Sequence, residues 1–198
     1  MAVKRSCVPL LISALLIPAL SWAESRATVP LSAPSGLAQK VCPAPAWNYG
    51  TVVWKGVVDA RSSPEIGLQT QKGKDPIPVY SEPAAAAAFD GALRELLPAC
   101  GMMLSDSGEP DSLVVTAELR EFYTGVEKKL FTGKSTSRSA ITFKALQGNR
   151  SSSVTVGYEM EAKKVRSGNI KQLQRSANEL FIETLKQIPE TPEMAELK

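Results

Sequence analysis

The hydrophobic pattern of the chain is most distinctive at residues 51–60, where apolar side chains occupy both faces of an extended segment. Val52, Trp54 and Val58 are predicted to point to one side, and the intervening valines to the other. A strand that is apolar on both faces belongs inside a sheet with a layer on each side. We therefore expect an interior strand, with helices on one face of the sheet and the linker or long loops partly covering the other.

Two further segments show the three- and four-residue apolar spacing of amphipathic helices. The first is predicted to begin after Ser81, an N-cap, and to end near Pro98; the second covers residues 170–188, before Pro189. Alternating apolar positions predict strands at residues 102–104, 113–119, 141–145 and 154–160. The predicted order is β-α-β-β-β-β-α.

This order predicts an α/β (α+β) fold, a single antiparallel-rich sheet with two helices packed on one face. A Pro-rich stretch without periodicity predicts a linker before the domain. Residues 61–80 and 123–137 are predicted to be long loops. The resulting division is a signal peptide at 1–23, a linker at 24–46, one α/β domain at 47–190 and a C-terminal tail at 191–198.

The first residues have the features of a secretory leader. Lys4 and Arg5 precede an apolar run at residues 8–20, and small residues flank a cleavage position after Ala23. The run is too short to cross ~30 Å of hydrocarbon, and Pro18 interrupts it, which disfavours a membrane anchor. We expect cleavage after about Ala23 and a periplasmic protein without a transmembrane span.

Removing the leader leaves a nearly neutral chain. The leader carries two of the 23 Lys and Arg and none of the 20 Asp and Glu, which leaves 21 against 20 and does not favour nucleic acid as a partner. Cys7 is lost with the leader, so Cys42 and Cys100 are predicted to form a disulfide, with two separate buried thiols as the alternative. No cysteine has the small-residue context of a lipid attachment site.

The catalytic repertoire of the chain is narrow. It contains no histidine, which removes the usual general base at neutral pH and the common zinc sites. No metal-ligand spacing or phosphate-binding glycine pattern is present, so we expect no cofactor. Asp59, Glu65 and Asp75 gather near the loop at 61–80 and provide the alternative of a glycan hydrolase or lyase. Carboxylates in a loop are more often a solvated surface.

A basic cluster is the remaining charge feature. Its candidate partner-binding residues, between two predicted strands, are Lys128, Lys129, Lys134 and Arg138. A second group follows the last predicted strand and consists of Lys163, Lys164 and Arg166. The two groups are predicted to share one end of the sheet and to bind an envelope protein or an anionic envelope polymer, with a solvated surface as the alternative.

Several segments match a known family in order and spacing. They are V-V-D-A-R at residues 57–61, A-L-R-E-L-L-P-A-C-G-M-M-L at 92–104, D-S-L-V-V-T-A-E-L at 111–119, R-S-A-I-T-F-K-A at 138–145, V-G-Y-E-M-E at 156–161 and the closing helix at 169–188. With these segments the chain resembles the YajG family of envelope lipoproteins of Gram-negative bacteria. The resemblance implies a small periplasmic α/β domain without known catalytic residues.

The sequence departs from the family at the leader, where the acylated cysteine is missing. The resulting hypothesis is a non-catalytic periplasmic cell-envelope protein, a binding or accessory module for an envelope protein complex or polymer.

Overall fold

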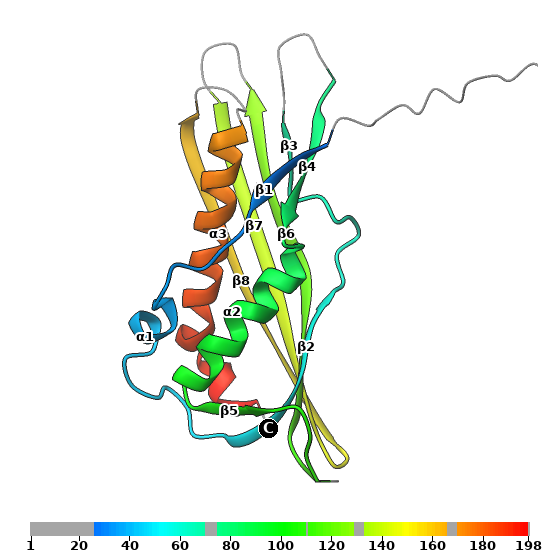
Figure 1. Ribbon diagram of the computed structural model, residues 1–198, viewed down its shortest axis with the longest axis vertical. Coiled ribbons are helices and arrows are strands. Elements are labelled where there is room, and N and C mark those ends of the chain that lie inside the picture. The colour runs from blue at the N-terminus through cyan, green and yellow to red at the C-terminus, as the bar shows by residue number, and fades with distance from the viewer. Residues whose placement is uncertain (1–25, 70–74, 110, 129–132, 166–169, 198) are drawn as a thin grey trace, which may run out of the picture.

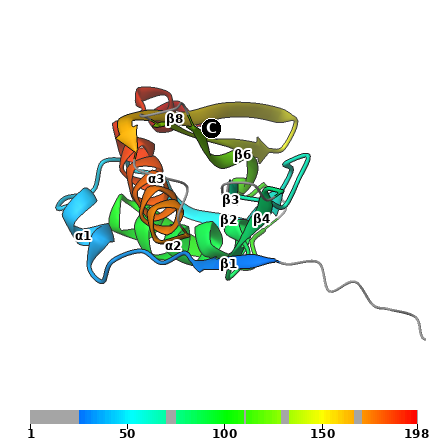
Figure 2. The same ribbon diagram turned by 90° about the horizontal axis from the view of Figure 1, so that it is seen from above.

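The computed structural model describes residues 26–69, 75–109, 111–128, 133–165 and 170–197, with the backbone alone at 126–128, 133–134 and 162–165. The predicted signal peptide lies outside the described residues. Within them the chain forms one curved, eight-stranded sheet, and helices α2 and α3 lie on its concave side (Figures 1 and 2). The predicted mixed α/β fold with two helices on one face is therefore confirmed.

The strands are β1 (Ala27–Pro30), β2 (Gly50–Asp59), β3 (Gly67–Gln69), β4 (Ile77–Glu82), β5 (Met102–Ser105), β6 (Val114–Lys128), β7 (Gly133–Gln147) and β8 (Arg150–Val165). The helices are α1 (Leu37–Val41), α2 (Ala85–Ala99), α3 (Ile170–Glu190) and the 3-10 helix η1 (Pro192–Glu196). All seven predicted elements are present. The pattern missed β1, α1, β3, β4 and η1.

Strand β6 organises the sheet because both of its edges are paired. One edge pairs with β2 along its first half and with β3 at Thr124, and the other pairs with β7 along its length. The path on the first side is β1-β4-β3-β6-β2-β5, and β7 and β8 extend the sheet on the other side as an antiparallel meander. Strand β2 pairs in parallel with both β5 and β6, so the prediction of an interior strand is confirmed.

A β-bulge in β2 corrects the predicted orientation of Val58. Trp54 pairs with Val115 and Val57 with Ala117, so one extra residue is inserted in β2 between the two pairs. The insertion shifts the alternation, because successive side chains point to opposite faces. Val57 therefore packs against the core, whereas Val58 is exposed.

The prediction of an unstructured linker at 24–46 is wrong for residues 27–42, which are folded against the domain. Strand β1 pairs in parallel with β4, and Val29, Leu31 and Leu37 are buried. Asn178 in α3 fixes the segment between them, since its Nδ2 donates to the Pro30 carbonyl at 2.8 Å and its Oδ1 accepts from the Ser32 amide at 3.2 Å. Strand β1 lies at the edge of the sheet, where a proline such as Pro30 is tolerated.

The predicted long loops are also partly wrong. Residues 61–80 contain β3 and most of β4, which continues to Glu82, so the residue that precedes α2 is Ala84 rather than Ser81. Residues 123–137 belong to the extended ends of β6 and β7, apart from 129–132, which lie outside the described residues. The inward positions of these strand ends are small and polar, so the apolar alternation disappears there.

The predicted C-terminal tail packs against the domain instead of extending from it. Met194 and Leu197 are fully buried. The Tyr49 hydroxyl donates to the Met194 carbonyl and accepts a hydrogen bond from the Leu197 amide at 2.9 Å. The end of the chain is thus part of the core.

The convex face of the sheet is predicted to be partly covered by the linker or the long loops, and the linker does not cover it. The linker segment packs instead with α1 against α2. Val53 is buried, and a side chain at Gly108 would lie 2.5 Å from its Cγ2, so the loop after β5 covers this end of the face. Thr116, Thr142 and Leu146 on β6 and β7 remain partly or fully exposed.

The concave face holds the hydrophobic core, in which three aromatic rings connect the helices to the sheet. The ring of Phe89 in α2 packs edge-on against that of Phe122 in β6, with 5.4 Å between the ring centroids, and against that of Phe181 in α3, with 4.6 Å between the centroids. All three are at most 1% exposed. This cluster fixes both helices on the sheet and so positions the strand ends.

Candidate functional site

The backbone register brings the two basic groups of the sequence together. Lys134 of β7 pairs directly with Lys163 of β8, and its other partner is Glu127 of β6. Lys128 occupies the last position of β6, and Lys164 lies in the same end of β8. We call these four lysines at the ends of β6, β7 and β8 the basic end. Lys129 and Arg166 lie outside the described residues.

Arg138 does not belong to the basic end, although it is close in sequence. It lies four residues further along β7, where it pairs with Tyr123 and Glu159. Its Nε donates to the Glu159 carboxylate at 3.0 Å, and this hydrogen bond, together with nearby Glu121 and Glu161, raises the pKa of Arg138. The surroundings of Arg138 are acidic, so its charge is already balanced within the sheet.

Of the three acidic residues near the loop at 61–80, Asp59 is held by the neighbouring Arg61. The Arg61 side chain is only 5% exposed, and it forms a two-pronged ion pair with Asp59, with Nε to Oδ1 at 2.8 Å and Nη2 to Oδ2 at 2.7 Å. The guanidinium also donates to three backbone carbonyls, those of Pro64, Glu65 and Phe122, at 3.3 to 3.4 Å. Arg61 therefore joins the end of β2 to the following turn and to β6.

Because the Asp59 carboxylate is paired with Arg61, its role is structural. The hydrogen bonds from Arg61 lower the pKa of Asp59, which keeps the carboxylate ionised and makes it a poor proton donor. The Glu65 carbonyl accepts one of the Arg61 hydrogen bonds. Burial raises the pKa of Tyr123, and the negative charge of the Glu65 side chain raises it further. Asp75 is exposed in the residues before β4. The sequence placed Asp59 near the loop at 61–80 but did not reveal that the buried guanidinium of Arg61 engages it.

The Asp59 ion pair predicts a specific pH dependence. A carboxyl group whose pKa is lowered by folding stabilises the protein above its unfolded pKa, near 3.8, and this contribution is lost as the pH falls through the lower folded value. Asp59→Asn should therefore lose less stability than wild type between about pH 5 and pH 2. Urea midpoints across this range measure the difference. Asp75→Asn, at an exposed position, serves as the control, and equal pH profiles for wild type and Asp59→Asn would contradict the assignment.

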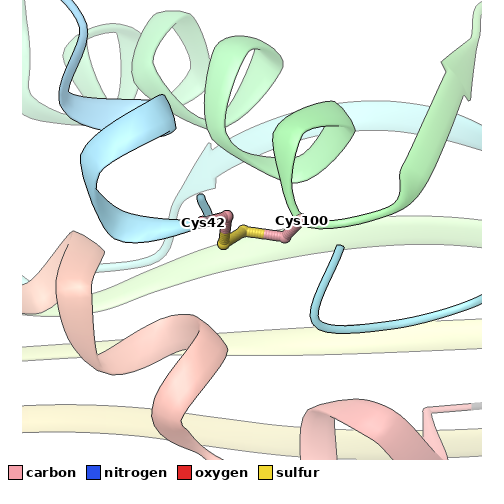
Figure 3. Close-up of a disulfide and its surroundings, with 2 residues drawn as sticks. All are labelled: Cys42 and Cys100. Atoms are coloured by element: carbon pink, nitrogen blue, oxygen red, sulfur yellow. A yellow bond between two sulfur atoms is a disulfide. The ribbon is translucent and has the colours of Figure 1, made fainter. Parts of the chain in front are cut away.

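The predicted disulfide is present between Cys42 and Cys100 (Figure 3). Their Cα atoms are 5.2 Å apart, within the ordinary range for a disulfide. Cys42 follows α1 and Cys100 follows α2, so the bond fastens the N-terminal segment to the end of the first long helix. Both residues are buried, and the Cys100 carbonyl accepts a hydrogen bond from the Trp47 amide at 2.9 Å.

Two negative findings concern the described part of the chain only. No group of three or more His, Cys, Asp or Glu residues in it is placed to hold a metal ion. Among the same residues, no helix has the length and apolar character needed to cross a membrane.

These features define a mixed α/β domain with a disulfide-fastened N-terminal segment and a basic end to its sheet. The chain belongs to the family Lipoprotein_16, described as "Uncharacterized lipoprotein", whose model matches residues 48–197. This is the YajG-type family that the sequence resembles, and membership indicates an envelope location. The match begins after β1, α1 and Cys42, and it includes the buried C-terminal segment.

Solved structures offer remote likenesses. Protein XCC0632 from Xanthomonas campestris is 14% identical, with a TM-score of 0.44 over 87% of this chain and 92% of that chain. A putative neuraminyllactose-binding hemagglutinin homolog from Helicobacter pylori is 12% identical, with a TM-score of 0.41 over 77% and 90%. Lipoprotein GNA1162 from Neisseria meningitidis is 6% identical, with a TM-score of 0.34 over 67% and 96%. No curated protein matches the chain. These TM-scores support no functional inference.

Proposed function

We propose that the protein is a non-catalytic periplasmic component of the cell envelope, exported by a leader that is cleaved after about Ala23. In this proposal it acts as a binding or accessory module and holds an anionic envelope partner at the basic end. The observation that carries the proposal is the register that gathers lysines from β6, β7 and β8. Family membership supports the envelope location.

The charge balance along the sheet supports this choice of surface. Residues 126–128 of β6, 133–135 of β7 and 163–165 of β8 contain four lysines and one acidic residue, Glu127, and Glu161 lies two residues before Lys163. Further along the sheet, cations are matched by anions, as in the pairs Lys144 with Glu118 at 2.6 Å and Arg138 with Glu159 at 3.0 Å. A local excess of one sign attracts a polyanion, whereas matched pairs do not. The alternative of a hydrolase or lyase is disfavoured because Arg61 engages Asp59.

Retention on isolated envelopes tests this function. Wild type should sediment with washed envelopes at low salt and be released at high salt, because exposed charges are screened beyond ~8 Å at physiological ionic strength. The triple variant Lys128→Glu, Lys134→Glu, Lys163→Glu should be lost already in the low-salt wash. Quantitative blotting of pellet and supernatant measures the distribution.

The matched control carries the same change of charge away from the basic end, as Lys40→Glu, Lys55→Glu, Arg150→Glu, at three exposed positions. It should remain with the envelopes. Thermal unfolding establishes that both variants are folded. Equal retention of wild type and the basic-end variant would overturn the proposed function.

A further inference from the structure

The N-terminal strand enters the sheet close to the basic end. Ala27 of β1 pairs with Val79, which also pairs with Gly67, and Gly67 pairs with Thr124 of β6. The same transverse row continues through Ser137 of β7 to Met160 of β8. The first residue of β1 therefore lies level with positions only a few residues from the ends of the three long strands.

The strand directions show from which side the chain arrives. Strand β1 is parallel to β4, β4 is antiparallel to β3, and β3 is parallel to β6, so β1 runs opposite to β6. Since β6 runs toward the basic end, the chain enters β1 from that end. Lys128 lies four residues beyond Thr124, about 13 Å along the strand at ~3.3 Å per residue. Lys134 and Lys163 each lie three residues beyond the same row.

The opposite end of the molecule contains the C-terminus, as Figure 1 shows. The turn between β7 and β8 also lies there, with Arg150 as the first residue of β8. The molecule thus has a polarity along the strands: the N-terminal strand enters at the end that holds the lysines, and the chain finishes at the other end.

From this juxtaposition we propose that the basic end faces an anionic lipid surface and binds the phosphates of lipid headgroups. The inference rests on the proposed function and names the partner. Until it is cleaved, the N-terminal leader holds the chain at the membrane, so during export the end of the domain next to the N-terminal strand is the end nearest the bilayer. Clusters of four or more lysines next to a membrane bind anionic headgroups.

The lysines also provide a means of membrane association that does not need an acyl chain. A lipoprotein family holds its members at a membrane by an acyl chain, and this sequence has no cysteine in an acylation context. Electrostatic attraction to anionic lipids is a second, independent means of peripheral membrane association. In this chain the basic end supplies that attraction reversibly and in a salt-dependent manner.

Vesicle flotation tests the inference. Protein produced from the full chain is mixed with phosphatidylcholine vesicles that contain or lack phosphatidylglycerol, and the floating fraction is measured at low and high salt. Wild type should float only with the anionic vesicles and only at low salt. Lys128→Glu, Lys134→Glu, Lys163→Glu should weaken this binding at least about 100-fold, because each lysine near an anionic surface contributes severalfold to affinity.

The control Lys40→Glu, Lys55→Glu, Arg150→Glu should bind anionic vesicles like wild type. Binding of wild type to neutral vesicles at an equal level, or equal loss in both triple variants, overturns the lipid assignment. If retention on envelopes depends on the basic end but no vesicles are bound, the proposed function stands and the partner is a protein or polymer. If neither depends on these lysines, both proposals fail.

Discussion

Arg61→Ala is expected to destabilise the protein by roughly 2–3 kcal/mol, the upper part of the range found when buried polar groups lose their hydrogen-bond partner. The side chain is 5% exposed and donates to the Asp59 carboxylate and to three backbone carbonyls. Its loss leaves these acceptors without their donor where β2, the following turn and β6 meet. Urea unfolding followed by far-UV circular dichroism measures the change.

Two variants separate this role from a simple loss of charge. Arg94 also forms an ion pair, with Asp90 at 2.9 Å, but its side chain is 46% exposed, so Arg94→Ala should cost less than about 1 kcal/mol. Arg61→Lys keeps the charge but cannot form the two-pronged geometry, and its cost should lie between the two. If Arg61→Ala lowers the free energy of unfolding no more than Arg94→Ala does, the buried guanidinium does not stabilise the contact between β2, the following turn and β6.

Removal of the disulfide should have an effect of similar size. The bond closes a loop with a sequence separation of 58 residues, for which the chain-entropy model gives about 4 kcal/mol. The double variant Cys42→Ala, Cys100→Ala should lose about this much stability in urea. The N-terminal segment should also become sensitive to protease before the rest of the domain, because the bond is its covalent link to α2.

Reduced wild type provides the matching measurement. Its unfolding curve in the presence of a reductant should coincide with that of the double variant, and oxidised wild type should lie at higher urea. Thiol labelling of denatured, unreduced protein should detect neither Cys42 nor Cys100. Identical unfolding of oxidised and reduced protein would refute the stabilising role of the bond.

Elements with a clear apolar period could be predicted from the sequence. In α3, the buried Leu173, Ala177, Phe181, Leu185 and Ile188 recur at intervals of three or four residues, as expected for a helix with one face on a sheet. In β6, the buried Val115, Ala117 and Leu119 alternate with more exposed neighbours. Because such a repeat follows from the burial of one face, the elements that contain it could be predicted from the sequence.

The missed ends of the long strands have inward positions without an apolar signal. The far ends of β6 and β7 bury Thr124, Ser135 and Ser137. Small polar residues resemble loop composition, yet here they are buried in the sheet. Strands β1 and β3 have four and three residues and are defined by backbone pairing with β4, which no local sequence period encodes.

The candidate site was predicted in part. The sequence predicted that the two lysine groups share one end of the sheet, and the pairing of Lys134 with Lys163 confirms this. It also grouped Arg138 with them, whereas the register places Arg138 beside Glu159. The buried position of Arg61 could not be predicted, because it depends on the Phe122 carbonyl, 61 residues away.

The placement of β1 constrains the order in which the chain can fold. This strand is the earliest described element, yet it pairs with β4, and the residues after it are held by Asn178, which is 148 positions from Pro30. Contacts between such distant positions form slowly, because a long loop must close first. Strand β1 can pair only once β4 has been made, and the segment after it gains its hydrogen bonds to Asn178 only once α3 has docked, so the earliest described strand is among the last to be fully held in place.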